Sequence, residues 1–174
     1  GPATAGKTTF AKALVREFSL THIPIDPVMD GFRIVYPRLG ITSYADTRAK
    51  HERVCRNFGP FLREMIKSEF GDDVVFEGFH MPLEYLWRRY KTSHQFFVFG
   101  YPKISVDEKL DVIRRVDVNS WTNRKSDAVL RTIIEFLVDE SRRMERYCRR
   151  NRIPFFDTGA DYHGALRRAI SRVK

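Results

Sequence analysis

The chain has 174 residues, of which 43% are hydrophobic and 30% are charged, and it carries a net charge of +9. This composition excludes disordered, collagen-like and low-complexity proteins and predicts one domain, residues 1–174. Because no apolar run approaches the roughly 20 residues that span a bilayer, and no leader opens the sequence, we expect a cytoplasmic protein without membrane contact.

The positive charge and the two cysteines constrain the partners only loosely. A charge of +9 favours anionic partners, which include nucleotides, phosphorylated metabolites, nucleic acid and acidic lipid. Cys55 and Cys148 lie far apart with no second ligand nearby, so neither a disulfide framework nor a zinc site is indicated. We expect both cysteines to be inert helix residues.

The first expected elements are a helix, a strand and a helical insertion. Apolar residues at every fourth position predict an amphipathic helix over residues 6–18. Residues 22–26 are bounded by turn residues and predict a strand that carries Asp26 at its C-terminal end. Residues 27–70 follow as an insertion, and its helical pattern is interrupted by Pro37, Gly40 and Pro60.

The middle of the chain alternates strands with helices. Two short apolar runs, residues 74–76 and 95–99, are each followed closely by glycine and predict buried strands. Helices are expected over residues 82–90 and 106–116. This alternation is typical of an α/β protein with a parallel sheet.

The last third begins with Ser126, a favourable N-cap for the longest predicted helix. A strand is expected over residues 153–157, and a closing helix over residues 162–173. Pro24 and Pro154 limit the first and last strands to sheet edges, because proline cannot donate a hydrogen bond to the ladder.

The first eight residues satisfy the pattern G-x-x-x-x-G-K-[ST] and run directly into the first predicted helix. This is the Walker A phosphate-binding loop, or P-loop, in which backbone N–H groups at a helix N-terminus hold phosphates. In this pattern Lys7 neutralises the β- and γ-phosphate oxygens, and the Thr8 hydroxyl ligates Mg²⁺. The residues expected to bind ATP here are Gly1, Ala3, Thr4, Ala5, Gly6, Lys7, Thr8 and Thr9.

With this loop the chain resembles the small P-loop kinases of the nucleoside and nucleotide kinase type, which include adenylate, uridine, gluconate and shikimate kinases and chloramphenicol phosphotransferase. The likeness covers almost the whole chain: the loop, the strand ending at Asp26, residues 74–78, a lid-like stretch at 109–124 and the end at 155–158. The loop is a specific signal for this resemblance, whereas each of the other segments taken alone is a weak one. Residues 77–82 also resemble a segment of 2-phosphoglycerate kinases.

The resemblance implies a three-layer P-loop kinase fold with a five-stranded parallel sheet of order 2-3-1-4-5, a helical acceptor-binding insertion at residues 27–70 and a lid at 109–131. The first strand of that sheet is the central one, and the sequence shows none before Gly1. Since an empty central slot would leave backbone groups unpaired, we expect a short apolar segment upstream. The alternative is that Gly1 and Pro2 are a cloning remnant that completes the motif by chance.

Two carboxylates at strand ends are the candidate catalytic and metal groups. Asp26 is expected to orient the acceptor hydroxyl, because ligands bind beyond strand carboxyl ends and the resembled kinases often place a carboxylate there. The alternative is that Asp26 caps a helix that starts at Pro27. Glu77 ends a buried strand, so it is expected to face Mg²⁺ as the Walker B residue of the resembled family, with a structural salt bridge as the alternative.

The lid is expected to exclude water and to supply cations to the transferring phosphate. Arg114 and Arg124 are the candidates for that catalytic role. The lid departs from the family pattern because Lys109 stands where an arginine is expected.

Further candidates lie on the acceptor side and after the last strand. Asp30, Arg33 and His80 are expected to bind the acceptor, although a surface charge for Arg33 and a structural role for His80 are the alternatives. Thr158 and Gly159 fall where the resembled kinases hold adenine, or else form an ordinary turn.

Together the motif and the resemblance imply an ATP- and Mg²⁺-dependent phosphotransferase that moves the γ-phosphate to a small molecule, by resemblance a nucleoside or nucleotide. The next alternative is a kinase that acts on an antibiotic or a sugar acid. A polynucleotide 5′-hydroxyl kinase also fits, because the net charge of +9 suits nucleic acid. The non-enzymatic alternative is a module in which ATP and the lid switch a surface for a protein partner.

Overall fold

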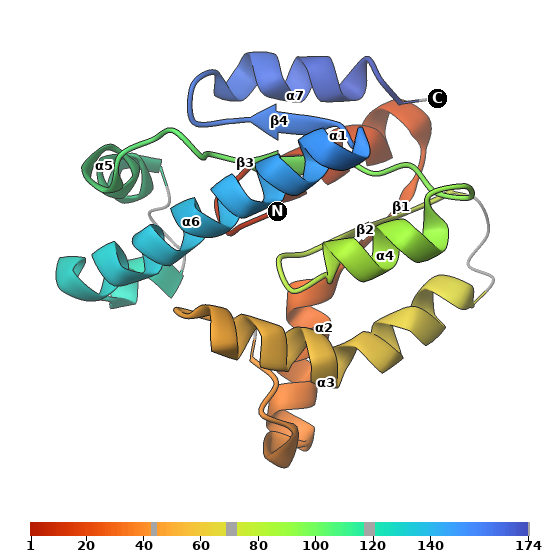
Figure 1. Ribbon diagram of the computed structural model, residues 1–174, viewed down its shortest axis with the longest axis horizontal. Helices are drawn as coiled ribbons and strands as arrows, with labels where there is room; N and C mark the ends of the chain where they lie inside the picture. The colour runs from red at the N-terminus through yellow and green to blue at the C-terminus, as the bar shows by residue number, and fades with distance from the viewer. Residues whose placement is uncertain (43–44, 69–72, 117–120, 174) are drawn as a thin grey trace. The chain divides into compact units, whose positions relative to one another are not determined.

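The computed structural model describes residues 1–42, 45–68, 73–116 and 121–173 (Figure 1). The chain divides into two compact units. Lys7–Phe96 and Ile170–Lys174 form one, called here the α1–α4 unit, and Gly1–Gly6 and Phe97–Ala169 form the other, the β3–α7 unit. In the described parts of both units, no helix is long and apolar enough to cross a membrane.

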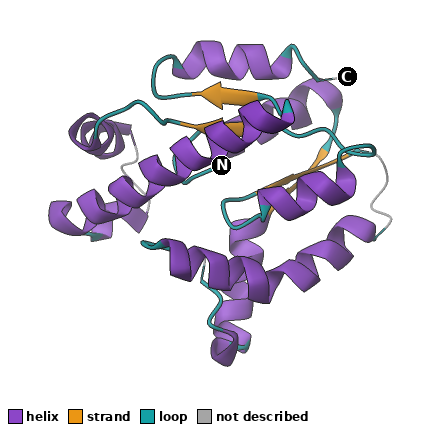
Figure 2. Cartoon of the chain, viewed as in Figure 1, coloured by secondary structure: helices purple, strands orange, loops and turns teal. Residues whose placement is uncertain are grey.

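The expected five-stranded parallel sheet of order 2-3-1-4-5, and with it the three-layer P-loop kinase fold, is wrong. The described residues are 63% helical, and their strands form two separate two-stranded sheets, β1–β2 and β3–β4 (Figure 2). Both pairs are parallel, as the alternation of strands and helices suggested. An inner strand must form hydrogen bonds along both of its edges, and no strand among the described residues does so.

In the α1–α4 unit, the sheet pairs β1 (Thr21–Pro24) with β2 (Val74–Glu77). The register sets Pro24 opposite Glu77, so both strands end at the same level. Helix α1 (Lys7–Phe18) packs against both strands with the apolar side chains of its buried face. The strand pair therefore places the start of α1 and the ends of β1 and β2 in one compact unit.

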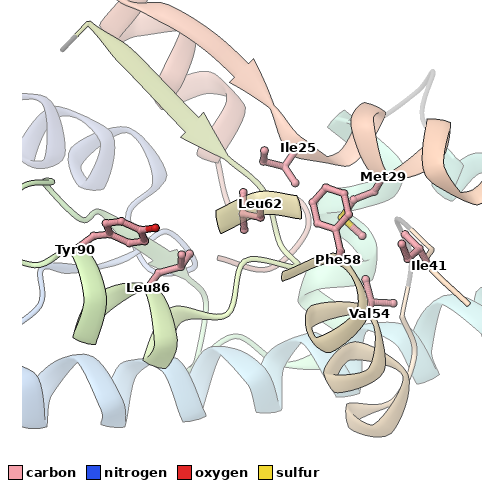
Figure 3. Close-up of a cluster of buried hydrophobic side chains, with 8 residues drawn as sticks. All are labelled: Ile25, Met29, Ile41, Val54, Phe58, Leu62, Leu86 and Tyr90. Carbon is pink, nitrogen blue, oxygen red and sulfur yellow. The ribbon is translucent and has the colours of Figure 1, made fainter. Parts of the chain in front are cut away.

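The apolar core of this unit lies among α2 (Ile25–Val35), α3 (Arg48–Lys67) and α4 (Leu83–Tyr90). Figure 3 shows side chains from all three helices gathered in one cluster. Fully burying a large apolar side chain contributes about 1.5–3 kcal/mol, so this cluster is a major source of the unit's stability. Its members are Ile25, Met29, Ile41, Val54, Phe58, Leu62, Leu86 and Tyr90.

Helix α3 continues through Pro60, which the sequence predicted to interrupt it. Val54, Phe58 and Leu62 recur on one face and are almost completely buried. Their burial outweighs the hydrogen bond that proline cannot donate within the helix. The breaks expected at Pro37 and Gly40 are confirmed, because a short 3-10 turn, η1 (Pro37–Leu39), ends there with Gly40 in the left-handed conformation.

The β3–α7 unit pairs β3 (Val98–Gly100) with β4 (Phe155–Asp157) and packs α6 (Asp127–Asn151) against both strands. Helix α5 (Val106–Val116) lies against α6. The 3-10 turn η2 (Trp121–Arg124) precedes α6, and α7 (Tyr162–Ile170) follows β4.

Two positions limit α6 at its ends. The Ser126 hydroxyl accepts a hydrogen bond from the Val129 N–H at 3.5 Å, which confirms the predicted N-cap. At the other end Arg152 adopts the left-handed conformation, with φ of 57°, and its N–H bonds to the Cys148 carbonyl. Such a C-terminal turn satisfies a carbonyl that the helix itself leaves unpaired.

Candidate functional site

Four polar side chains meet where β1 and β2 end, and we call them the strand-end cluster: Lys7, Thr8, Asp26 and Glu77. Lys7 and Thr8 open α1, and Glu77 is the last residue of β2. All four belong to the α1–α4 unit. The structure thus brings together four residues that the sequence singled out for catalysis or metal binding.

Asp26 reaches this cluster from a helix rather than from a strand. The strand expected over residues 22–26 ends at Pro24, and Asp26 lies in the first turn of α2. Proline is compatible with the first turn of a helix, so Pro27 allows α2 to begin at Ile25 instead of after Asp26. Ile25 is completely buried in the core, which fixes this turn and the carboxylate that follows.

Thr8 and Glu77 are joined directly. The Thr8 hydroxyl donates a hydrogen bond to Oε1 of Glu77 at 2.9 Å. His22 Nε2, on the neighbouring strand, lies 3.4 Å from the same oxygen. The second oxygen of Glu77, Oε2, is buried and has no hydrogen-bond partner among the described residues.

Asp26 is the second carboxylate with an unsatisfied oxygen. Its Oδ1 is buried without a hydrogen-bond partner in the described part of the chain, although the Phe79 backbone N–H donates to the carboxylate. Burial raises the pKa of Asp26, and the nearby Glu77 carboxylate adds to this effect, while Lys7 and the Phe79 N–H oppose it. A raised carboxylate pKa is typical of groups that exchange protons during catalysis.

The pKa of Lys7 is shifted in the opposite direction to that of Asp26. Burial lowers the pKa of its ammonium group, whereas the charges of Asp26 and Glu77 raise it. The ammonium group is thus held near two carboxylates in a poorly solvated setting, where electrostatic interactions are stronger than in water.

The donor set of the strand-end cluster fits Mg²⁺ and a phosphate group. Magnesium prefers hard oxygen ligands, and Thr8 and Glu77 supply a hydroxyl and a carboxylate. Leaving buried carboxylate oxygens without a partner is costly, and a bound cation would remove that cost.

The predicted phosphate loop before Lys7 in sequence belongs to the β3–α7 unit, where side chains donate hydrogen bonds to two of its carbonyl groups. The Tyr101 hydroxyl donates to the Ala3 carbonyl at 2.8 Å, and Lys109 Nζ donates to the Thr4 carbonyl at 3.1 Å. Lys109 Nζ also lies 3.9 Å from the centre of the Tyr101 ring. These bonds occupy two carbonyl oxygens that would otherwise repel an anion.

Two loop glycines are required by close approach. A Cβ on Gly1 would collide with the carbonyl oxygen of Phe99 on β3. Gly6 has φ of 85°, and a Cβ there would lie 3.0 Å from the Tyr162 ring. Ala5 is completely buried, while Thr9 is exposed on α1.

The two arginines of the predicted lid differ in their surroundings. Arg114 donates to Asp127 Oδ1 at 2.7 Å, to the Lys125 carbonyl at 2.8 Å and to the Thr122 carbonyl at 3.4 Å. Arg124 is exposed and has no such partners among the described residues. Asn119 and Ser120, within the predicted lid, lie outside the described residues.

The other predicted site residues lie apart from the strand-end cluster or use their polar groups locally. Asp30 and Arg33 form an exposed ion pair at 3.2 Å on α2. Thr158 is buried, and its N–H and hydroxyl both donate to the Gly100 carbonyl, at 2.8 and 3.1 Å. The Gly159 N–H donates to the Asp157 carboxylate at 2.9 Å, so these three donors all serve the turn after β4.

His80 is completely buried and lies against His51, a residue that the sequence did not single out. Its Nδ1 lies 2.9 Å from Nδ1 of His51, and His51 Nε2 lies 3.7 Å from the Cys55 sulfur. The expectation that Cys55 has no second ligand nearby is therefore wrong. The missed signal is the spacing of His51 and Cys55, which puts both on one face of a helix.

Comparisons with protein-family models, with curated proteins and with solved structures found no match to this chain. The loop motif and the geometry of the strand-end cluster are therefore the observations that bear on function.

Proposed function

We propose that this protein is an ATP-dependent phosphotransferase that moves the γ-phosphate of Mg·ATP to a hydroxyl or phosphate of a small molecule, with a nucleoside or nucleotide as the leading acceptor class. One observation carries the proposal. Directly after a phosphate-loop sequence, Lys7 and Thr8 meet two carboxylates that each keep a buried oxygen without a hydrogen-bond partner among the described residues.

The nucleotide side of the proposal comes from the sequence motif. In the Walker A pattern that residues 1–8 satisfy, backbone N–H groups and a helix N-terminus bind phosphate oxygens, and the lysine, here Lys7, balances their charge. The bonds from Tyr101 and Lys109 to the loop carbonyls support this arrangement, because they hold two acceptor oxygens of the loop.

Thr8 and Glu77 are the residues that would hold Mg²⁺. Their side-chain oxygens already lie 2.9 Å apart, and Glu77 Oε2 supplies a further ligand atom. When bound, the ion neutralises charge on the β- and γ-phosphate oxygens.

Asp26 acts on the acceptor in this proposal. Its carboxylate orients the acceptor hydroxyl and takes its proton as the new bond from the acceptor oxygen to the γ-phosphorus forms and the bond to the ADP oxygen breaks. Burial raises the pKa of Asp26, which makes it a stronger base than an exposed carboxylate. The proposal places this reaction in the cytoplasm.

The test is ADP release from Mg·ATP by the full chain, with nucleosides, nucleotides, sugar acids, antibiotics and 5′-hydroxyl oligonucleotides as separate acceptor pools. We expect one pool of small molecules to stimulate ADP release, and both Lys7→Ala and Asp26→Asn to abolish the stimulation. Lys12→Ala is the matched control, because Lys12 is an exposed lysine of the same helix.

Other outcomes separate the alternatives. Stimulation by oligonucleotides alone would show that the acceptor is a polynucleotide and not a small molecule. ATP binding without stimulation by any pool would contradict a phosphotransferase and favour a nucleotide-responsive module. If the wild-type chain does not bind ATP, residues 1–8 are not a phosphate-binding loop.

A further inference from the structure

A second cluster of chemically reactive side chains lies in the α1–α4 unit and has no part in the proposed reaction. His51 and Cys55 occupy successive turns of α3, and His80 follows strand β2. One ligand atom from each of the three residues lies within 4.8 Å of the other two. His51 and His80 are buried, and Cys55 is half-buried.

Local structure holds the two imidazoles in place. His51 is 4% exposed, and its ring stacks on Phe79 with a centroid distance of 4.5 Å and an interplanar angle of 28°. Phe79 precedes His80 and is itself buried, with a ring distance of 4.9 Å to that imidazole. The rotamers are thus restricted by packing, which lowers the entropic cost of binding an ion.

The three donors match a borderline or soft divalent cation. Imidazole nitrogen and thiolate sulfur are the usual ligands of zinc, with Zn–N distances of about 2.0–2.1 Å and Zn–S distances of about 2.3 Å. In a tetrahedral site these lengths put ligand atoms about 3.3–3.6 Å apart. With one nitrogen taken from each histidine, the three ligand atoms all lie within 4.8 Å of one another, so a modest closing of the cluster brings them to this spacing.

We propose that His51, Cys55 and His80 form a binding site for Zn²⁺, with three protein ligands and a fourth position open to water or another small ligand. Each histidine supplies one ring nitrogen, and Cys55 binds as the thiolate. The thiol proton leaves to solvent as the metal–sulfur bond forms, so no oxidant or reductant is needed. The site is independent of the phosphotransferase proposal, because none of its ligands belongs to the strand-end cluster.

Magnesium is a poor competitor for this site. It prefers oxygen ligands in octahedral geometry, whereas the cluster offers two nitrogens and one sulfur. An excess of Mg²⁺ should therefore leave zinc binding unchanged, which separates the two candidate metal sites in one sample.

The test uses the full chain after treatment with a chelator, titrated with Zn²⁺ against a chromophoric zinc indicator. We expect one equivalent of Zn²⁺ to bind, with release of about one proton at a pH below the ordinary pKa of a cysteine thiol. Substitution with Co²⁺ should give a thiolate charge-transfer absorption together with the visible bands of a tetrahedral site. This spectrum reports the ligands themselves and needs no enzymatic activity.

Variants identify the ligands. Cys55→Ser should weaken zinc binding at least about 100-fold and remove the cobalt charge-transfer band, and His51→Gln should weaken binding similarly. Cys148→Ser is the matched control, because Cys148 is a helical cysteine in the other unit, and it should retain wild-type affinity. Circular dichroism of each metal-free variant checks that it is folded.

Several results would overturn the proposal. A folded wild-type chain that does not compete with the indicator has no such site. Unchanged affinity in folded Cys55→Ser, or a cobalt spectrum without thiolate bands in the wild type, would place the metal elsewhere. If His51→Gln does not fold, the wild-type cobalt spectrum and Cys55→Ser still decide the question.

Discussion

The charged groups of the strand-end cluster in the α1–α4 unit and those of the predicted lid in the β3–α7 unit differ in their hydrogen bonding. Asp26 and Glu77 each keep a buried oxygen without a hydrogen-bond partner among the described residues. Arg114 instead makes hydrogen bonds to Asp127 and to two backbone carbonyls. Both regions were predicted to contain catalytic residues.

The difference separates groups that support the fold from groups available to a ligand. A charged side chain with several partners stabilises the fold, and moving it to a ligand would require breaking those bonds. A buried carboxylate oxygen without a partner costs stability in the absence of a ligand. Such a cost is expected at functional sites, where binding a ligand or an ion compensates for it.

The largest effect is expected from Asp26→Asn. Loss of the proton acceptor should reduce acceptor-dependent ADP release by about 10²–10⁴-fold. A steady-state assay measures this effect, and Asp111→Asn, an exposed carboxylate on α5, is the matched control. If Asp26→Asn turns over at a rate close to that of the control, Asp26 takes no part in the reaction. The contrast between the strand-end cluster and the Arg114 region would then say nothing about catalysis.

The same substitution should act on stability in the opposite direction. Burial raises the pKa of Asp26, so the folded state favours its neutral form, and stability is lost as the pH rises through that raised pKa. Near neutral pH, Asp26→Asn should therefore raise the free energy of unfolding, by about 0.5–2 kcal/mol. Urea unfolding at pH 7 and at pH 4 should show the advantage shrinking at the lower pH.

Thr8→Val is expected to have the next largest effect, and it tests whether Thr8 is a magnesium ligand. The valine lacks the hydroxyl that donates to Glu77 Oε1, and we expect the Mg²⁺ concentration for half-maximal turnover to rise roughly 10–100-fold. Titration of Mg²⁺ at fixed ATP measures the change. An unchanged magnesium requirement would exclude Thr8 as a ligand.

Arg114→Ala probes the other side of the comparison. Removing the hydrogen bonds to Asp127 and to the carbonyls should lower the free energy of unfolding by about 1–2 kcal/mol, a modest value because the pair is partly exposed. Arg124→Ala, an exposed residue, should change it by less than about 0.5 kcal/mol. Loss of turnover in Arg114→Ala without loss of stability would make Arg114 a catalytic residue.

The smallest effect is expected from Ser126→Ala. The hydroxyl accepts from the Val129 N–H at the start of α6, and its loss should cost about 1 kcal/mol in the free energy of unfolding. Turnover measured well below the melting temperature should remain that of the wild type. A change in turnover would mean that the start of α6 belongs to the site.

Local elements were predicted well, and the sheet was not. The helix over residues 106–116 matches α5, because apolar periodicity depends only on neighbouring residues. The strand expected over residues 95–99 begins only at Val98. Phe96 packs against the apolar core of the α1–α4 unit and Phe97 stacks on Phe156, so apolar character there reflects packing rather than strand pairing.

For the candidate site, too, local features could be predicted from the sequence and contacts between distant elements could not. The loop motif led to Lys7 and Thr8, and strand ends led to Glu77 and, two residues beyond β1, to Asp26. The structure places these four side chains close together, and their roles stay predictions. The contact between His51 and His80 could not be predicted, because it joins α3 to the turn after β2 and depends on how the two pack.

The buried position of Lys109 has a consequence for chemical labelling. Its amino group bonds to the Thr4 carbonyl, and the residue is 5% exposed, whereas Lys12 is exposed on α1. Amine-directed reagents should modify Lys12 readily and Lys109 slowly. The labelling rate of Lys109 therefore measures how often the hydrogen bond between Lys109 Nζ and the Thr4 carbonyl breaks.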